Sequence, residues 1–218
     1  MKTATATTLT RDFYARPTLD VAQDLIGMVL VHETRAGVAA GVIVEAEAYI
    51  GEADPACHAA PGPTVRNAPL YGPPGLAYVY LNYGIHYLVN AVTEEEGSPA
   101  AVLIRALEPI EGIGLMRRRR ARGTNRAAAD FDEAGLCRGP GNLTRALGIT
   151  IAQNRLDLTG GPLRIEERGL ARGREVRWSR RIGVNVGVEH EWRCTDVSSP
   201  AVSGRNGRAT GAGSTRRR

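Results

Sequence analysis

The alternation of apolar and polar residues is clearest in two neighbouring segments near the start of the chain. Residues 28–34 and 37–50 both have the composition of β-strands, and the dipeptide Arg35-Ala36 between them predicts an antiparallel hairpin. Successive side chains of a strand point to opposite faces of the sheet. The second strand therefore carries Val44, Ala46 and Ala48 on one face and Glu45, Glu47 and Tyr49 on the other.

Further segments extend this pattern into a mixed architecture. An apolar stripe at helical spacing predicts a helix over residues 18–27, with Thr18 as its N-cap. The remaining predicted elements are strands at 76–82, 86–93 and 100–107, a helix from Pro109 toward Arg122, a short helix in 139–150, a hairpin in 156–169 and a final sheet segment in 180–197. Strands and helices mix without a regular βαβ alternation. We therefore expect an α+β fold, a single domain with a curved, mostly antiparallel β-sheet core and surrounding helices.

Composition and charge fit one folded domain with unlike ends. The chain has 218 residues, 43% hydrophobic and 23% charged, which suffices for one domain with a real core. We expect a flexible N-terminus over 1–12, a domain over 13–202 and a basic, disordered tail over 203–218. The five arginines from Arg205 onward account for the net charge of +5. Overall charge is therefore weak evidence for a nucleic-acid partner, and local segregation of charge matters more.

The sequence also excludes several classes of protein. No apolar run is long enough to cross a bilayer, and residues 1–13 lack the apolar core of a secretory signal. The three cysteines are far apart and form no paired motif, which favours a reducing compartment. We therefore expect a cytoplasmic protein, associated with the nucleoid if its source is a bacterium.

Between residues 44 and 90 the chain becomes aromatic and then nearly uncharged. Arg66 carries the sole formal charge from residue 59 to residue 93, and five tyrosines lie between Tyr71 and Tyr87. Glycine and proline recur through 51–75, which predicts a loop. Acids lie just before this region. The combination indicates a pocket for a flat, weakly polar ligand, which we interpret as a nucleobase.

Glu47 is the candidate general base of this pocket. A solvent-facing strand edge is the ordinary interpretation of a Glu-x-Glu-x-Tyr pattern. Against it, the opposite face offers only valine and alanine, and the strand runs straight into the aromatic segment. A glutamate in a dry, aromatic setting can activate a water molecule.

His58 follows Cys57, so a Cys/His nucleophilic pair is open in principle. Neighbouring side chains of an extended chain point apart, however, and stacking or hydrogen bonding is the better interpretation of His58. The four histidines show no metal-ligand spacing. We expect neither a metal nor another cofactor.

The tyrosines and Asn90 each allow an ordinary and a functional interpretation. Tyr78 and Tyr80 could simply pack within a strand, since aromatic residues are common there. Tyr83 differs because it stands beside Gly84 at a turn, where its ring would protrude like a wedge that enters a base stack. Asn90 is either a plain strand residue or an amide that hydrogen-bonds a base edge.

Basic residues suggest contacts with phosphate. Arg105 lies inside an apolar strand, and a buried arginine is costly unless a carboxylate or phosphate pairs with it. Residues 139–141, Gly-Pro-Gly before a helix, can offer backbone N–H groups to a phosphate. The arginine block 117–122 could contact a DNA backbone or could be the solvated C-terminal end of a helix, and both remain open.

Several long motifs, in this order and spacing, resemble the alkyladenine (3-methyladenine) DNA glycosylase family. They are VEAEAYIG at 44–51, His58, Arg66-Asn67, GPPGLAYVYLNYGIHYLVN at 72–90, VLIRALEP at 102–109, GPGNLTRALGI at 139–149 and RIGV at 181–184. The resemblance spans roughly residues 13–203. It implies a monomeric, single-domain α+β protein whose protruding hairpin enters the minor groove of double-stranded DNA.

The resemblance also implies a role for the reacting groups. Glu47 resembles the general base that activates water. Arg105 resembles the residue that helps to hold that water and the nearby phosphate. The chain departs from its relatives at His86, where others carry an aromatic ring, and over 190–200, which shapes the far rim of the pocket.

Four further positions resemble the groups that handle the base. Tyr49, His58 and Tyr80 resemble the aromatic walls that stack on a flipped base. Asn90 resembles the residue that clashes with the amino group of normal guanine. Tyr83 resembles the wedge that fills the vacated space.

The implied reaction is hydrolytic. An enzyme that acts on a base inside a duplex must flip it out, at a cost of a few kcal/mol. An alkylated purine leaves easily and stacks well on electron-rich rings. Lys2 is the sole lysine, whereas an enzyme that also nicks the strand uses an amine. We therefore expect a monofunctional DNA glycosylase for alkylated or deaminated purines, the 3-methyladenine, 7-methylguanine and hypoxanthine class, that starts base excision repair.

A second hypothesis keeps the fold but not the chemistry. The chain could be a noncatalytic nucleic-acid-binding module, with the tail as a nonspecific tether to DNA. Glu47, Arg105 and the aromatic set together favour the enzyme.

Overall fold

The structure is a computed structural model, and it describes residues 6–204. Lys2 and the five arginines of the predicted tail lie outside these residues, as do the other residues of 1–5 and 205–218. Within the described range, no helix has the length and apolar character needed to span a membrane.

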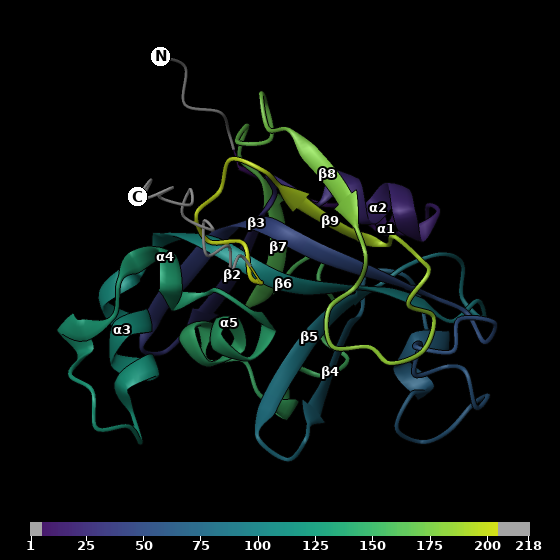
Figure 1. The fold of residues 1–218 in the computed structure, drawn as a ribbon, viewed down its shortest axis with the longest axis horizontal. Coiled ribbons are helices and arrows are strands. Elements are labelled where there is room, and N and C mark those ends of the chain that lie inside the picture. Colours follow the sequence, from purple (N-terminus) through teal and green to yellow (C-terminus); the bar gives the residue numbers. More distant parts are fainter. Residues whose placement is uncertain (1–5, 205–218) are drawn as a thin grey trace, which may run out of the picture.

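One nine-stranded sheet organises the domain, and the pairings of its strands are antiparallel (Figure 1). The main path runs in the order β1-β7-β2-β3-β6-β5-β4, and β8 and β9 form a branch that joins it at β3. The strands are β1 (Thr7–Thr8), β2 (Val29–Thr34), β3 (Gly37–Ile50), β4 (Ala77–Asn82), β5 (His86–Val92), β6 (Ala100–Glu111), β7 (Leu163–Glu167), β8 (Val176–Ser179) and β9 (Arg193–Asp196). The predicted α+β class with a mostly antiparallel sheet is confirmed.

The other elements of the sheet converge on β3. One edge of β3 pairs first with β2 and then, over Glu45–Glu47, with β9. The other edge pairs with β6 along most of its length. The predicted hairpin between β2 and β3 is present, with Thr34 opposite Gly37. The candidate carboxylates therefore lie on the strand with the most backbone hydrogen-bonding neighbours.

A β-bulge at Val44 alters the predicted alternation along β3. Val44 has no partner in the register between β3 and β6, while the residues on either side of it do. Its side chain packs in a separate small cluster, whereas Ala46 and Ala48 join the main core. The prediction that Val44 shares their face is wrong, because a bulge inserts one residue and re-aims the side chains around it.

The helices are short and cover the sheet unevenly. They are α1 (Arg11–Tyr14), α2 (Thr18–Asp24), α3 (Ile113–Ala121), α4 (Glu133–Leu136) and α5 (Pro140–Leu147), with 3₁₀ turns at Ala68–Tyr71, Ala128–Asp130 and Ile151–Gln153. The helices α3, α4 and α5 gather on one side of the hairpin formed by β4 and β5 (Figure 1). The predicted helix over 139–150 is thus present as α5, and Gly148 ends it with a left-handed φ of 75°.

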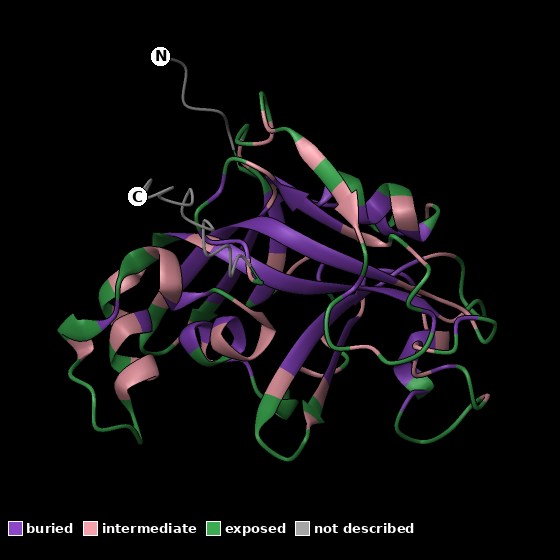
Figure 2. Cartoon of the chain, in the orientation of Figure 1, coloured by how far each residue is buried: buried purple, intermediate pink, exposed green. Residues whose placement is uncertain are grey.

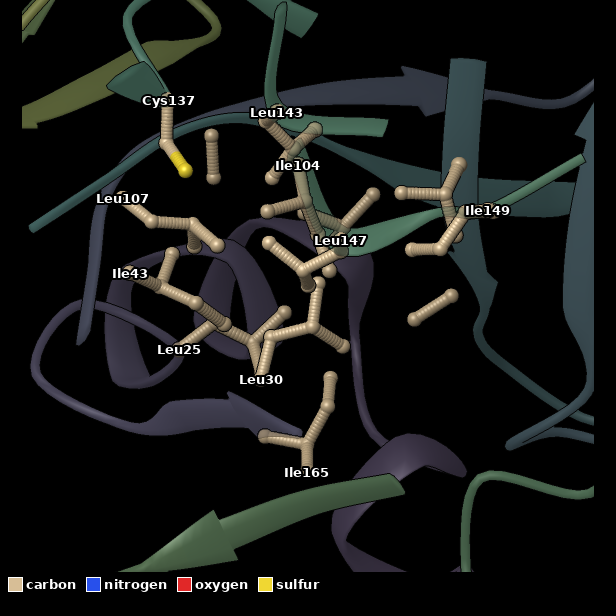
Figure 3. Close-up of a cluster of buried hydrophobic side chains, with 14 of the residues drawn as sticks. Leu25, Leu30, Ile43, Ile104, Leu107, Cys137, Leu143, Leu147, Ile149 and Ile165 are labelled. Atoms are coloured by element: carbon tan, nitrogen blue, oxygen red, sulfur yellow. The ribbon is translucent and has the colours of Figure 1, made fainter. Parts of the chain in front are cut away.

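The core lies where α5 and the chain after α2 meet the sheet. Five fully buried side chains pack together there (Figure 3): Leu25, Leu30, Ile43, Ile104 and Leu143. Figure 2 shows that the centre of the sheet is buried, whereas the tip of the β4–β5 hairpin is exposed. This core is large enough to hold β3 and β6 rigidly, and both strands supply residues to the site.

Pro109 lies in a strand, which corrects the predicted helix start. Strand β6 continues to Glu111, and Pro109 stands opposite Gly41 beside a shift in register with β3. An irregular pairing tolerates the missing N–H of proline. Helix α3 begins only at Ile113, after Gly112 turns the chain with a φ of 73°. A side chain at Gly112 would come within 2.1 Å of a backbone oxygen, so only glycine fits there.

Two other local predictions also need correction. Pro17, and not Thr18, is the N-cap of α2, because the Thr18 hydroxyl donates instead to Glu94 Oε1 at 2.6 Å. Residues 156–169 form no local hairpin, since their only strand, β7, pairs with β2 and β1.

Both described ends of the chain lie against the domain. Strand β1 pairs with β7, and Arg11 forms an ion pair with Asp157 at 2.6 Å. Near the other end, the Ser203 N–H donates to Glu45 Oε2 at 2.7 Å. Contacts with the fold therefore extend on both sides of the predicted domain of residues 13–202.

Candidate active site

A cavity of about 540 Å³ opens where the end of β3, the β4–β5 hairpin and the start of α5 meet. We call it the aromatic cavity. Loop residues 182–184 complete its wall. The predicted site residues that line it are Tyr49, His58, Tyr80, Tyr83, Asn90 and Arg105. Glu47 lies beneath this lining, with no exposed surface and with hydrogen bonds to three lining residues, Tyr49, Arg105 and Ile182.

Three donors converge on the Glu47 carboxylate. The Tyr49 hydroxyl donates to Oε2 at 2.9 Å, and Arg105 Nη1 donates to the same oxygen at 3.1 Å. The backbone N–H of Ile182 donates to Oε1 at 2.8 Å. These bonds fix the orientation of the carboxylate. Its complete burial rules out the solvent-facing strand edge that the Glu-x-Glu-x-Tyr pattern also allowed.

Arg105 lies between two buried glutamates. Its Nε donates to Glu45 Oε1 at 2.8 Å, while Nη1 reaches Glu47. The expected carboxylate partner of this arginine is therefore present twice. Arg193 also donates to Glu45 Oε1, at 2.8 Å. Two arginines thus balance two acids, which a buried charge cluster requires to be tolerated.

The two carboxyl groups differ in acidity. Burial raises the pKa of Glu47 above its ordinary value of 4.5, and the attraction of Arg105 only partly opposes this. Burial would also raise the pKa of Glu45, but Arg105 and Arg193 together hold that pKa below 4.5. Paired carboxyls with pKa values moved in opposite directions are typical of acid–base sites.

His58, Tyr78 and Tyr80 form one aromatic cluster in the cavity wall. His58 Nδ1 and the Tyr78 hydroxyl are hydrogen-bonded at 2.8 Å, and the His58 and Tyr80 rings meet edge to face at 4.4 Å. Burial and the nearby Arg66 lower the pKa of His58 below 6.5, so the imidazole is neutral at pH 7. Among the described residues no hydrogen bond joins Cys57 to His58, and burial raises the pKa of Cys57 to about 11. The site thus offers stacking surface and no activated thiol.

Asn90 lies deep in the cavity on β5. It is buried, and its Nδ2 donates to the Tyr78 carbonyl at 2.9 Å. The side-chain amide is therefore held in one orientation beside the aromatic cluster. Sequence alone left its position open between core and pocket.

Tyr83 occupies the tip of the β4–β5 hairpin, which projects beyond the other strands of the sheet (Figure 1). Tyr83 and Gly84 have φ values of 49° and 69°, the geometry of a tight hairpin turn that favours Asn or Gly. Tyr83 is 86% exposed and Ile85 is 72% exposed. A bulky ring at a left-handed position is unusual and costs backbone strain. The local fold alone gives no reason for a tyrosine there.

The sequence gives little sign of a buried ion pair that joins Asp54 to Arg181. Its two hydrogen bonds measure 2.6 and 2.8 Å, and Arg181 also stacks over the Tyr49 ring at 4.7 Å from its centroid. The pair joins the loop after β3 to the loop before β9. It thereby positions the Ile182 N–H that holds Glu47. The RIGV motif was the sole signal, because the partners lie 127 residues apart.

The arginine block of α3 divides by function. Arg119 donates to the Leu147 carbonyl at the end of α5, and Arg120 donates to the Leu136 carbonyl at the end of α4. Arginines that satisfy the last carbonyls of a helix are structural. Arg118 and Arg122 are exposed and make no such bond among the described residues. The Gly-Pro-Gly turn, by contrast, contributes directly to the aromatic cavity through Gly139, Pro140 and Gly141.

No group of three His, Cys, Asp or Glu side chains between residues 6 and 204 is arranged to bind a metal ion. The absence of a cofactor stays a prediction.

Comparisons with known proteins agree with this geometry. The family profile described as methylpurine-DNA glycosylase (MPG) matches residues 12–200. A protein of Rubrobacter xylanophilus is 54% identical over 171 residues, which cover 78% of this chain and 84% of the relative. A Rhodopseudomonas palustris protein is 48% identical over 185 residues, 85% of this chain and 82% of the relative. A Methanocella arvoryzae protein is 47% identical over 203 residues, 90% of this chain and 96% of the relative. All three carry the provisional name 3-methyladenine DNA glycosylase.

Proposed function

The chain belongs to the methylpurine-DNA glycosylase family, and from that premise we propose that it excises alkylated or deaminated purines from duplex DNA. The substrates we expect are the 3-methyladenine, 7-methylguanine and hypoxanthine class, which the provisional names of its relatives suggest in part. The reaction is hydrolysis of an N-glycosidic bond by a protein that acts as a monomer.

The observation that carries this proposal is the state of Glu47. It is a fully buried carboxylate with a raised pKa beneath an aromatic cavity, and Tyr49, Arg105 and Ile182 hold it in place. A carboxylate with a pKa nearer to neutrality accepts a proton more readily than an ordinary glutamate does. We assign Glu47 as the general base that takes a proton from water.

The proposed step balances simply. The oxygen of the water attacks C1′ of the sugar as the bond between C1′ and the purine nitrogen breaks. The departing purine keeps the bonding electrons, and a cationic alkylated purine thereby leaves neutral. Glu47 receives the proton of the water. Arg105 keeps Glu47 paired and lies on the cavity wall, where it can also contact the water or a phosphate.

The cavity walls suit a flipped purine. Tyr49, His58 and Tyr80 offer ring faces and edges, and the neutral His58 does not repel a positively charged base. Electron-rich rings attract a cationic, alkylated purine more strongly than a normal one. Asn90 is held in one orientation by its bond to the Tyr78 carbonyl, and we assign to it the rejection of the exocyclic amino group of guanine. Discrimination would then come from stacking and from steric exclusion.

Tyr83 suits the role of the wedge. Its ring is exposed at the tip of a projecting hairpin. The positive φ of Tyr83 costs backbone strain that no contact within the fold explains, which favours a role in binding. A ring inserted into the duplex would replace the stacking that the flipped base gives up.

The proposal is monofunctional chemistry. A lyase reaction on the sugar would need an amine, and residues 6–204 contain no lysine. Water activated by Glu47 is then the nucleophile, and the product is an intact strand with an abasic site.

A duplex oligonucleotide that contains hypoxanthine or a methylated adenine tests the proposal. The expected result is release of the free base without added metal, followed by strand cleavage only after alkali. Binding of the damaged duplex with no release from any lesion would instead favour a noncatalytic binding module. Cleavage without alkali would contradict the monofunctional assignment.

A further inference from the structure

A second cavity, of about 890 Å³, lies between α3, the C-terminal half of α5 and the β4–β5 hairpin. Five arginines line it and no acidic residue does: Arg35, Arg118, Arg119, Arg122 and Arg145. We call it the basic groove. Residues 1–200 contain equal numbers of basic and acidic residues, so this local excess of positive charge stands out.

Two of these arginines bond within the fold, and three, Arg35, Arg118 and Arg122, are exposed without a side-chain hydrogen bond to any of residues 6–204. Arg119 caps the end of α5, and Arg145 donates to backbone carbonyls at the end of α3. Arg118 and Arg122 are exposed, and within residues 6–204 they donate no side-chain hydrogen bond and pair with no acid. The crowding has an electrostatic cost, because burial and then the charges of Arg122 and Arg118 lower the pKa of Arg119. Such an arrangement favours an external anion.

The basic groove adjoins the aromatic cavity. His86 and Gly141 line both, and they touch so closely that a Cβ on Gly141 would lie 2.6 Å from His86 Cγ. Ile85, near the hairpin tip, lines the groove, while Tyr83 lines the cavity. The His86–Gly141 contact is thus a partition, and the tip of the hairpin stands at its end.

We propose that the basic groove binds the phosphodiester backbone of the DNA strand opposite the damaged one. This inference rests on the proposed function. A hairpin in the minor groove, about 6 Å wide, has one backbone on each side. If the damaged nucleotide enters the aromatic cavity on one side of the partition, the backbone of the other strand runs past the opposite side. Guanidinium groups are well suited to bind phosphate there.

The double substitution Arg118→Ala/Arg122→Ala tests the groove. Each lost phosphate contact lowers the slope of log K against log salt by about 0.9 for duplex DNA, so the slope should fall by about 2. Affinity for a lesion duplex should then drop about 60-fold at 0.1 M salt, and the loss should grow as salt decreases. Fluorescence anisotropy over a salt series, with a non-hydrolysable lesion analogue, measures both quantities.

Matched variants distinguish the loss of contacts in the basic groove from a general loss of positive charge. Arg172→Ala/Arg177→Ala removes the same charge from exposed positions in and before β8, away from the hairpin, and should leave the slope unchanged. Arg118→Lys/Arg122→Lys keeps the charge and should restore most of the slope. Thermal melting of each variant checks that the fold is intact. Equal slopes for wild type and the Ala variant would overturn the proposal, as would an equal loss in the Arg172/Arg177 pair.

Neutral methylphosphonate linkages identify the strand. Placed in the undamaged strand, they should weaken the wild type and leave the Arg118/Arg122 double variant nearly unaffected. The same pattern from linkages in the damaged strand alone would overturn the assignment. Failure of the proposed function is recognised separately, because the wild type would then release no base from any lesion, whatever the salt slope.

Discussion

The aromatic cavity and the basic groove share the contact between His86 and Gly141, yet they treat charge in opposite ways. Below the cavity, Glu45, Glu47 and Arg105 are buried, and Arg105 pairs with both glutamates. In the groove, Arg118 and Arg122 are exposed and, among the described residues, without an acidic partner. Paired, buried charges fix the position of a reacting group, while unpaired, exposed charges attract a polyanion over distance. The contrast fits the roles we propose, in which the aromatic cavity selects and cleaves and the basic groove contributes affinity.

The largest expected effect comes from Glu47→Gln. Loss of a positioned general base should reduce the single-turnover rate of base release by about 10²- to 10⁴-fold, while duplex affinity stays near that of the wild type. The substitutions in the basic groove should instead reduce duplex affinity and change the single-turnover rate little. Glu96→Gln, in an exposed turn, is the matched control. Unchanged turnover in Glu47→Gln would remove Glu47 from the mechanism.

Asp54→Asn should destabilise the protein much more than a substitution in the basic groove does. It leaves the buried Arg181 without its ionic partner, which costs about 3–5 kcal/mol in the free energy of unfolding. Base release should fall as well, because Arg181 positions the Ile182 N–H on Glu47. Arg118→Ala should change stability by no more than about 0.5 kcal/mol. Urea denaturation of both variants gives the two values, and similar values would show that burial of the pair is unimportant.

Tyr83→Asn should move binding and stability in opposite directions. Loss of the ring removes about 1–3 kcal/mol of base stacking, a reduction of about 5- to 150-fold in affinity for a lesion duplex. Asparagine accepts a positive φ better than tyrosine, so the midpoint of thermal unfolding should stay equal or rise. Tyr83→Trp should keep the affinity. A variant that loses stability together with affinity would indicate a structural tyrosine instead of a wedge.

The smallest effect is a shift in pH dependence. The pKa of Glu47 is raised, so its deprotonated fraction, and with it base release, should decline on acidification at a pH above 4.5. The pKa of Glu45 is lowered, so its contribution to stability is present above pH 4.5 and is lost only as pH falls through that lower value. Activity should therefore disappear before the fold does, with duplex binding retained. Single-turnover rates and circular dichroism over one pH series compare the two; coincident losses would contradict the prediction.

The period of the β-strands made much of the site predictable. Alternation along β3 placed Glu45, Glu47 and Tyr49 on one face, and their mutual contacts through Arg105 follow from that placement. The turn at Gly84 likewise predicted an exposed Tyr83. In both cases the relevant information is local, because neighbouring residues on one strand determine which way a side chain points.

Long-range features could not be predicted in this way. The pairing of Asp54 with Arg181 depends on two loops that meet only in the folded chain. The bulge at Val44 and the strand position of Pro109 both depend on register with a partner strand, which no single segment encodes. The basic groove was half visible as an arginine block, but the sequence does not distinguish Arg119, which caps a helix, from Arg118, which does not. The assigned roles of the site residues remain proposals for the experiments above.

Glu47 lies on a strand that pairs on both edges, and this affects the order in which parts of the protein unfold. Strand β3 is bonded to β6 on one side and to β9 on the other at this point. Amides in such a segment exchange with solvent hydrogen only when the whole domain opens, whereas hairpin tips exchange through local opening. Mild heating or low concentrations of denaturant would therefore open the hairpin tip at Tyr83 well before they displace Glu47. Under the roles we propose, a partly destabilised variant would bind DNA less tightly while Glu47, Tyr49 and Arg105 stayed in contact.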